Sequence, residues 1–254
     1  MRWYHTLELP GGEITPGEYD LRPIVDRLPW PASLEGKRCL DVGSRDGFYA
    51  FEMERRGAAE VVSLDVDDPA AYHLPEPREA GGNPMAEIED GKRAFEHAHA
   101  AMGSNVRRVY KSVYEITPEE LGGEFDLAVI GTLLLHLRDP VAALTAIRRC
   151  LRGPLIVNDV IATGPISLSR KPRAEMLMQH GPFWWLPNPA GLERMVTAAG
   201  FTVTDRSRPY VIPWGAAGQT ITWRHLLRRP LTDLPRRLVH RRGALHVWLL
   251  AEPS

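Results

Sequence analysis

Short, mostly apolar runs alternate with amphipathic stretches along most of the chain. The runs predict strands buried on both faces, and the stretches, whose apolar residues recur every three or four positions, predict helices. The predicted strands are residues 38–44, 60–66, 106–116, 125–131, 155–162, 202–207 and 245–251, and the predicted helices are residues 47–57, 89–102, 140–151 and 189–200. This alternation predicts an α/β fold of the Rossmann-like, doubly wound kind with a mostly parallel seven-stranded sheet.

Two late segments depart from this alternation. Residues 163–187 are rich in proline and contain Trp184 and Trp185, whereas residues 210–243 contain seven arginines and one acid between residues 224 and 242. Ligands of open α/β sheets bind at the carboxyl ends of the strands, where such late insertions often lie. We therefore expect both segments to be lids that contact the substrate, and residues 1–35 to form an N-terminal cap.

The composition is that of an ordinary globular domain. Of 254 residues, 44% are hydrophobic and 25% are charged, and the formal net charge of −1 gives no overall attraction to nucleic acid or to an anionic membrane. No apolar stretch reaches the roughly 18 residues of a spanning helix, and the N-terminus lacks an apolar leader core. We expect a cytoplasmic protein with no membrane partner, whose oligomeric state the sequence does not indicate. Cys39 and Cys150 lie in apolar segments and are expected to be small core residues.

The most informative stretch is the exit of the first predicted strand, Asp41-Val-Gly-Ser-Arg-Asp-Gly47. A glycine such as Gly43 lets a ligand approach the backbone where a side chain would block it. Asp65 ends the second predicted strand, and its carboxylate can accept both hydroxyls of a ribose. The two features together predict a nucleotide-containing cofactor.

Two cofactors fit this outline, and the loop favours one of them. A dinucleotide fingerprint starting at Gly43 needs glycine at positions 45 and 48, where the chain has Arg45 and Phe48. The acid Asp41 suits a ligand with sulfonium and ammonium groups better than a pyrophosphate. The loop therefore favours S-adenosylmethionine over the alternative, an NAD-dependent oxidoreductase.

Further pocket positions follow the third and fourth predicted strands. Ser112, Val113 and Tyr114 could hold adenine, and Gly131 and Leu133 would lie beside the methionine part of the cofactor. The predicted cofactor contacts are Asp41, Gly43, Ser44, Arg45, Gly47, Asp65, Val66, Ser112, Val113, Tyr114, Gly131 and Leu133.

These motifs resemble those of a known family. The D-x-G-x-x-x-G strand exit, Asp65 and the segment FDLAVIGTLLLHLRDP look like class I S-adenosylmethionine-dependent methyltransferases, which implies a single domain over residues 1–254. More narrowly, the chain resembles the tRNA wobble-uridine methyl and carboxymethyl transferases. That likeness is carried by the segment WYHTLELPGGEITPGEYDLR near the N-terminus, by His136 with Asp139-Pro140, and by Trp184-Trp-Leu-Pro187.

The chain departs from the narrower family at several positions. Arg45 replaces the central glycine of the strand-exit loop, and Leu135 stands where carboxymethyl-transferring members have tyrosine. Those members also use basic residues to bind the extra carboxylate; Arg22 could match one of them, but His246 stands where an arginine is expected. The departures favour plain methyl transfer.

Methyl transfer from a sulfonium depends mainly on alignment in a dry pocket, and a base is needed only when the nucleophile must lose a proton. His136 is the first candidate for that base, and a histidine that merely packs on the next helix is the alternative. His5 and His180 are further candidates. Trp184 and Trp185 could stack on an acceptor ring or anchor a lid. No spacing of histidines, cysteines and acids indicates a metal site.

The acceptor is open between two kinds of molecule. Paired arginines in residues 224–242 could neutralise the phosphates of a tRNA, or could be the solvated face of an amphipathic helix pair. A small metabolite or natural product is the favoured acceptor and tRNA is the alternative. A non-catalytic module that retains the pocket is a third hypothesis.

Overall fold

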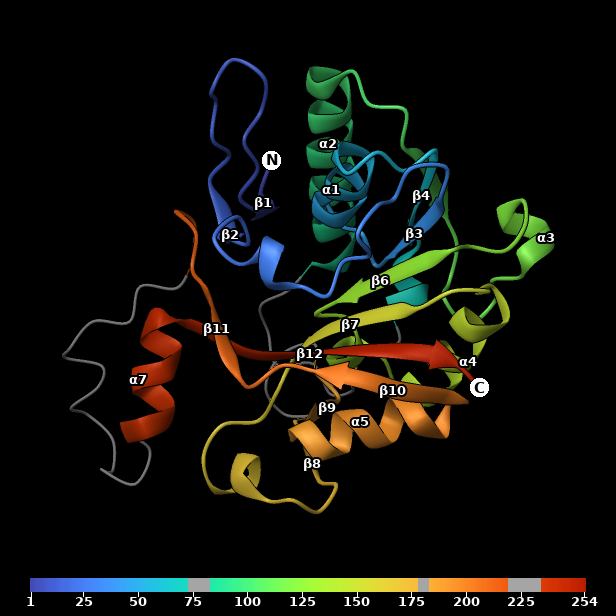
Figure 1. The fold of residues 1–254 in the computed structure, drawn as a ribbon. Coiled ribbons are helices and arrows are strands. Elements are labelled where there is room, and N and C mark those ends of the chain that lie inside the picture. Colours follow the sequence, from blue (N-terminus) through green and yellow to red (C-terminus); the bar gives the residue numbers. More distant parts are fainter. Residues whose placement is uncertain (73–82, 178–182, 219–233) are drawn as a thin grey trace.

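A sheet of eight strands forms the centre of the described molecule (Figure 1). The computed structural model describes residues 1–72, 83–177, 183–218 and 234–254, apart from the side chains of residue 72 and of residues 234–237. The strand order is β10-β12-β7-β6-β3-β4-β5, with β11 also paired to β12. The strands are β3 (Arg38–Val42), β4 (Glu60–Asp65), β5 (Arg107–Tyr110), β6 (Leu127–Gly131), β7 (Leu155–Val160), β10 (Phe201–Arg206), β11 (Tyr210–Pro213) and β12 (Gly243–Pro253).

Strands β3 to β7 are parallel, whereas β12 runs antiparallel to β7, β10 and β11. The predicted α/β class and the mostly parallel sheet are therefore confirmed. One strand of this eight-stranded sheet was not predicted, because β11 comes from the segment expected to be a late lid. Predicted strand 106–116 is shorter in the structure, where β5 ends at Tyr110.

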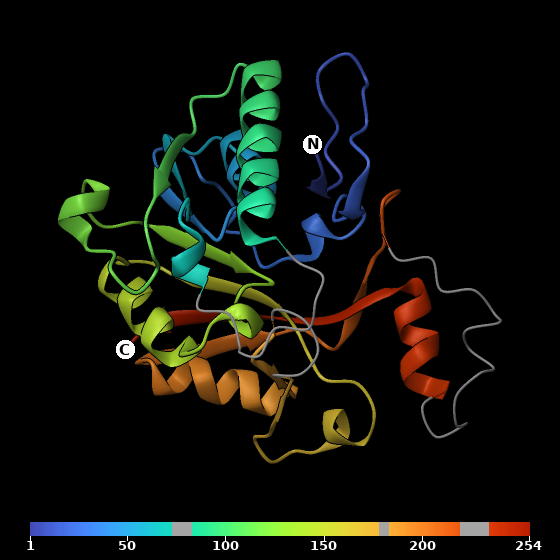
Figure 2. The ribbon, with the colours of Figure 1, turned by 180° about the vertical axis from the view of Figure 1, so that it is seen from behind.

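Helices cover both faces of the sheet, as Figures 1 and 2 show. Helices α1 (Phe48–Arg55) and α2 (Pro84–Met102) pack in one apolar cluster, and α4 (Pro140–Arg149) and α5 (Pro189–Ala198) pack in the other. The remaining helices are α3 (Pro118–Leu121), α7 (Leu234–Arg242) and the short 3-10 turns η1 (Val25–Arg27), η2 (Pro69–Tyr72), η3 (Leu134–His136) and η4 (Pro165–Leu168).

The central strands alternate between these two clusters. On β3, Cys39 faces the cluster of α1 and α2, and Leu40 faces that of α4 and α5. On β6, Val129 faces the cluster of α1 and α2, and Ile130 faces that of α4 and α5. Because both sides of a strand are buried, nearly every position is apolar, which is why these strands read as continuous runs. Cys39 and Cys150 are both buried, unpaired core residues, as expected.

The N-terminal cap begins with two short parallel strands, β1 (Trp3–His5) and β2 (Gly17–Tyr19). A Cβ at Gly17 would lie 2.2 Å from the carbonyl carbon of His5, so only glycine permits this approach. Tyr19 makes a β-bridge with Trp214, which follows β11. Figure 2 shows the cap beside α2. Residues from the start of the chain and from its last quarter thereby meet at one edge of the fold.

Asn188 organises the first late segment. Its side chain accepts from the N–H of Gly191 at 2.8 Å, so it caps the N-terminus of α5. The same side chain donates to the carbonyls of Ser169 and Lys171, at 2.8 and 3.0 Å. Within this segment, β8 (Ala174–Met176) and β9 (Trp185–Pro187) form a small antiparallel pair. Across the described ranges, no helix combines the length and apolarity needed to cross a bilayer.

Candidate functional site

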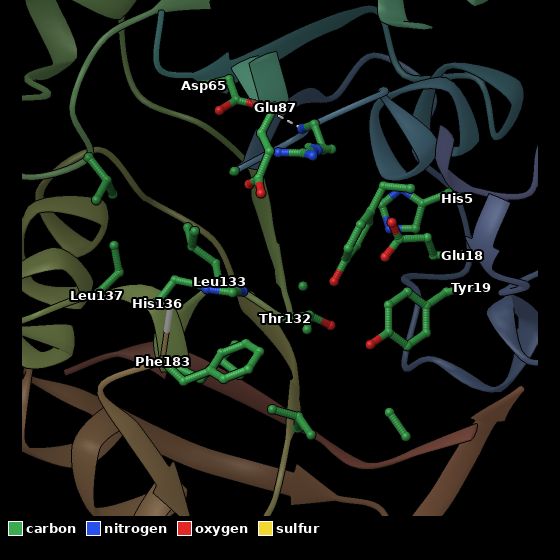
Figure 3. Close-up of a pocket in the computed structure, with 18 of the residues that line it drawn as sticks. His5, Glu18, Tyr19, Asp65, Glu87, Thr132, Leu133, His136, Leu137 and Phe183 are labelled. Atoms are coloured by element: carbon green, nitrogen blue, oxygen red, sulfur yellow. Dashed lines mark hydrogen bonds between the residues drawn. The ribbon is translucent and has the colours of Figure 1, made fainter. Parts of the chain in front are cut away.

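A cavity of about 530 Å³ opens at the carboxyl ends of β3, β4, β6 and β7 (Figure 3). The cap closes one side of it, and the loop after β6 closes another. Its size and position are those of a small-molecule site in an open α/β sheet. Nine of the twelve predicted cofactor contacts line it, namely Gly43, Arg45, Asp65, Val66, Ser112, Val113, Tyr114, Gly131 and Leu133.

The strand-exit loop reaches the cavity through its backbone. Gly43 has a φ of 72°, and a Cβ there would lie 2.7 Å from the Leu133 side chain. Arg45 has a φ of 53°, a conformation that is unusual for a residue with a side chain. The glycine that the family has at this position would adopt it freely, so Arg45 is held there by its surroundings. One of the contacts that hold it is the bond from its N–H to Asp65, at 2.7 Å.

Asp41 lies behind this loop, which corrects the expectation that it faces the cofactor. Its carboxylate accepts the Ser44 hydroxyl at 2.5 Å and the Ala50 N–H at 3.0 Å, and it is 1% exposed. Burial raises the pKa of Asp41 to about 6. Ser44 and Gly47 also lie outside the cavity wall. These three residues shape the bend, whereas Gly43 and Arg45 line the cavity.

Asp65 lines the cavity with one hydrogen-bonding position to spare. Its Oδ2 accepts from Arg45 N and from Arg108 Nη2, at 2.7 and 2.9 Å, and its Oδ1 accepts from Val66 N at 2.8 Å. A carboxylate has about four lone-pair positions, so one remains on Oδ1 for a ligand hydroxyl. A second carboxylate, that of Glu87 on α2, also lines the cavity (Figure 3).

The predicted adenine contacts lie in a loop, because β5 ends at Tyr110. Ser112, Val113 and Tyr114 all line the cavity, and the Tyr114 hydroxyl accepts from the N–H of Asp139 at 3.1 Å. That bond ties the loop to the start of α4.

The loop after β6 is fixed by buried polar groups. Thr132 has a φ of 50°, and its hydroxyl lies 3.1 Å from Nε2 of His246. Since Nδ1 of His246 donates to the Ala244 carbonyl at 3.0 Å, Nε2 is the acceptor in a neutral ring. Burial lowers the pKa of His246 to about 4. His246 is fully buried and brings no charge to the cavity.

A buried carboxylate holds the turn that carries His136. Asp159 accepts from the N–H groups of Leu134 and Val160, at 2.8 and 2.7 Å. Burial raises the pKa of Asp159 to about 7. The ring of His136 faces the cavity and packs against Phe183, with 5.2 Å between ring centroids.

The second predicted histidine, His5, also lines the cavity, from the opposite side (Figure 3). Its Nδ1 lies 2.5 Å from Asp46 of the strand-exit loop. The third, His180, lies outside the described residues.

The predicted substrate contacts lie elsewhere, which corrects that part of the expectation. Trp185 donates from Nε1 to the Arg138 carbonyl at 3.2 Å and lines a shallow groove beside α4, and Trp184 packs near the Arg138 guanidinium. Their neighbour Phe183 is the residue that reaches the cavity. Arg22 is paired with Asp20 through two bonds of 2.9 and 2.8 Å and lies outside the wall.

Sequence reasoning missed Tyr4, Glu18 and Tyr19 of the cap and Trp214 after β11, all of which line the cavity. Nothing in the local sequence indicates that residues 18, 19 and 214 lie beside residues 4 and 5. Among the described residues, no group of three or more histidines, cysteines and acids could hold a metal ion.

Comparison of the sequence with known protein families assigns the chain to one family. The model of a family described as a methyltransferase domain matches residues 16–206, three quarters of the chain. The chain belongs to this family. Membership of this family supports S-adenosylmethionine, which the strand-exit loop favoured, over NAD as the cofactor. It also confirms an enzyme of the methyltransferase class.

A curated relative from Pseudomonas aeruginosa, named tRNA U34 carboxymethyltransferase, is 30% identical over 185 residues. The match covers 69% of this chain and 48% of the relative, so the chain spans about half the length of the curated relatives it matches.

Two solved structures share the fold. One is a proposed methyltransferase from Bacillus halodurans, with a TM-score of 0.54 at 13% identity, covering 88% of this chain and 95% of that chain. The other is a chain of the complex between the Haloferax volcanii Trm112 activator and a proposed methyltransferase, with a TM-score of 0.54 at 13% identity, covering 90% and 86%.

Proposed function

We propose that this methyltransferase binds S-adenosylmethionine in the cavity at the carboxyl ends of β3, β4 and β6 and transfers its methyl group to a small-molecule acceptor. The observation that carries the proposal is one continuous cavity with the Gly43 bend and the Asp65 carboxylate on one side and the aromatic cap on the other. Asp65 and Glu87 would hold the ribose, and the loop after β6 would lie beside the methionine. The cytoplasm is the expected compartment.

Plain methyl transfer is favoured over carboxymethyl transfer. In the resemblance to carboxymethyl-transferring enzymes, basic side chains at positions 22 and 246 would bind the extra carboxylate of the cofactor. Arg22 is instead paired with Asp20 outside the wall, and His246 is a buried, neutral ring bonded to Thr132. Neither group is placed to bind an additional carboxylate.

A small acceptor is favoured by the cap side of the cavity, which is lined by rings. The centroids of Tyr19 and Trp214 lie 4.9 Å apart, and those of Tyr4 and Tyr19 lie 5.1 Å apart. Phe183 and Leu186 contribute apolar surface from the late segment. A flat molecule of modest size suits these walls. The tRNA alternative rests on the resemblance to the wobble-uridine transferases, on the names of the curated relatives and on the paired arginines of residues 224–242. Of that arginine run, residues 224–233 lie outside the described residues.

Thermal unfolding with S-adenosylhomocysteine and with NAD tests the cofactor. At one hundred times its dissociation constant, a bound ligand stabilises the fold by about 2.7 kcal/mol. We expect that stabilisation with S-adenosylhomocysteine and none with NAD. The reverse result would refute the proposal.

Binding of bulk tRNA tests the acceptor. A tRNA site neutralises phosphates, so its affinity falls steeply as salt is added. We expect no binding of bulk tRNA at low salt. Salt-sensitive binding there would replace the small-molecule proposal with the tRNA alternative.

A further inference from the structure

A buried histidine–carboxylate pair lies on the cap side of the cavity. His5 on β1 is 7% exposed, and Asp46 of the strand-exit loop is fully buried beneath it. Figure 3 shows His5, Glu18 and Tyr19 on one side of the hollow and His136 and Phe183 on the other. The pair joins the cap to the loop that carries Gly43.

Within the described part of the chain, the hydrogen bonds of the Asp46 carboxylate go to residues 4 and 5. Its Oδ2 accepts from the N–H groups of Tyr4 and His5, at 2.8 and 2.7 Å, and its Oδ1 lies 2.5 Å from Nδ1 of the His5 ring. Burial by itself would raise the pKa of Asp46, but the nearby His5 ring and these donors outweigh it and hold the pKa below its usual value. A buried carboxylate held in this way is ionised and fixed in position.

The bond to Asp46 decides which nitrogen of His5 is available. An ionised carboxylate only accepts, so the Nδ1 of the ring carries a proton, and in the neutral ring Nε2 keeps its lone pair. Among the described residues, no protein group bonds to Nε2, and the ring lines the cavity. A carboxylate that fixes the tautomer and orientation of a histidine also stabilises the ring once it becomes positive.

Neutral rings and buried carboxylates surround His5. The rings of Tyr4 and Tyr49 lie 4.7 and 6.3 Å from that of His5, and burial raises the pKa of both tyrosines, so both are neutral near pH 7. The Asp46 carboxylate bonds to the ring, and the buried Asp41 carboxylate interacts with it electrostatically. The Arg45 guanidinium lies over the Tyr4 ring, 5.8 Å from its centroid.

Two further groups line the cavity from β2. Burial raises the pKa of Tyr19 to about 12, so its hydroxyl is neutral as well. The Glu18 carboxylate is paired with Arg2 at 2.7 Å. Neither adds a positive charge next to the His5 ring.

We propose that His5 and Asp46 form a catalytic base and that the acceptor is a neutral aryl or enol hydroxyl. This inference rests on the proposed function, because the base acts only if a methyl donor is bound. A lone pair of the hydroxyl oxygen forms the bond to the methyl carbon, and the carbon–sulfur bond breaks with both electrons left on sulfur. The hydroxyl proton moves to Nε2 of His5. The products are a methyl ether, S-adenosylhomocysteine and an imidazolium held by Asp46.

The acceptor class follows from the need for a base and from the walls of the cavity. A thioether or tertiary amine would be methylated without losing a proton, whereas a neutral hydroxyl is a weak nucleophile until its proton leaves. The rings of Tyr4, Tyr19, Trp214 and Phe183 line the space that such an acceptor would fill. A hydroxyl attached to a flat ring satisfies both conditions.

The test compares wild type with His5→Asn on three probe acceptors, phenol, 4-methoxyphenol and 4-nitrophenol, by the rate of S-adenosylhomocysteine formation at pH 8. The asparagine amide can still donate to Asp46, so the cap stays tied to the loop, but the base is lost. We expect a loss of about 10²- to 10⁴-fold in kcat on phenol and 4-methoxyphenol. We expect a loss of only a few fold on 4-nitrophenol, which is already ionised, and an unchanged KM for S-adenosylmethionine.

His97→Asn is the matched control. His97 is exposed on α2, where its ring lies 5.9 Å from that of Trp3, and it does not line the cavity. This variant should keep the wild-type rates on all three phenols.

Three results would overturn the inference. An equal loss on every phenol would mean that His5 only holds the cap, and an unchanged rate on phenol would mean that it does nothing. Methylation of none of the phenols by a wild type that binds S-adenosylhomocysteine would refute the acceptor class and leave the proposed function standing. Failure to bind S-adenosylhomocysteine would instead refute the proposed function.

The protonation state of His5 gives a readout that needs no acceptor. Nitrogen NMR of wild type should show Nδ1 protonated and Nε2 without a proton, with a strongly deshielded proton between Nδ1 and Asp46. In Asp46→Asn the amide donates to the ring, so the proton should move to Nε2. A proton on Nε2 in wild type would overturn the assignment.

Discussion

The buried ring of His246 makes a prediction about stability at acid pH. The ring is fully buried, donates from Nδ1 to the Ala244 carbonyl and accepts the Thr132 hydroxyl at Nε2. Protonation would add a charge with no carboxylate bonded to the ring. In His246→Gln, the amide oxygen can accept the same hydroxyl, and the side chain does not titrate. Comparison of this variant with wild type isolates the effect of the ionisable ring.

The magnitude follows from the two pKa values of His246. The ordinary value is 6.5 and burial lowers it to about 4 in the folded protein, so the unfolded chain takes up the proton first. The contribution of this group to stability is therefore complete above pH 6.5 and is lost as the pH falls toward 4. At ~1.4 kcal/mol per unit, the full loss is about 3 kcal/mol, of which about 2 kcal/mol occurs between pH 7 and pH 5.

Urea unfolding at half-unit steps from pH 7.5 to 5 measures this loss. The free energy of unfolding of His246→Gln, minus that of wild type, should rise by about 2 kcal/mol between pH 7 and pH 5. Asp41 and Asp159 also titrate, with their pKa raised to about 6 and about 7, but they are present in both proteins and cancel in the difference. A difference that stays constant over this range would show that His246 is not a buried neutral base.

Three further predictions concern the cavity and the cap. Asp65→Ala should weaken S-adenosylhomocysteine binding about 10- to 100-fold, measured by calorimetry, because a hydrogen bond to a charged group is lost. An unchanged dissociation constant would show that the ribose lies elsewhere. His136→Ala should lower turnover about 100-fold with cofactor affinity retained if His136 also acts on the proton, and retained turnover would make it a packing residue. Gly17→Ala places a Cβ 2.2 Å from the His5 backbone, so it should lower both the melting temperature and the affinity for S-adenosylhomocysteine. A melting curve like that of wild type would contradict the close packing of β1 on β2.

The fold could be predicted from the sequence because its signals are local. Strands β3, β6 and β7 are buried on both faces and therefore read as apolar runs, and the N-cap Asn188 with Pro189 marks the start of α5. The candidate cofactor loop could also be recognised from the sequence, because Gly43 and Asp65 occupy fixed places relative to their strands. Elements at the edge of the sheet were harder to recognise. Strand β11 has four residues and lies in a segment whose prolines and arginines gave no strand pattern.

The orientation of side chains was decided by tertiary structure. Asp41 and Asp65 both end strands and both looked like ligand contacts, yet Asp41 turns back onto Ser44 and Ala50, and only Asp65 faces the cavity. Phe183, rather than Trp184 or Trp185, reaches the cavity because the two tryptophans pack toward Arg138. Neighbouring residues in extended chain point in opposite directions, and sequence alone does not say which direction faces a ligand.

The sequence by itself determined the class of fold and the family and indicated the loop proposed to hold the cofactor, because these depend on periodicity and on short motifs within single elements. Only the tertiary structure brought His5 onto Asp46, forty-one residues away, and Tyr19 beside Trp214. Such contacts arise where the cap and the late segment close over the sheet, and their partners are separated by long stretches of chain. The proposed base and the proposed acceptor side of the cavity therefore follow from packing, whereas the proposed cofactor site follows from motif.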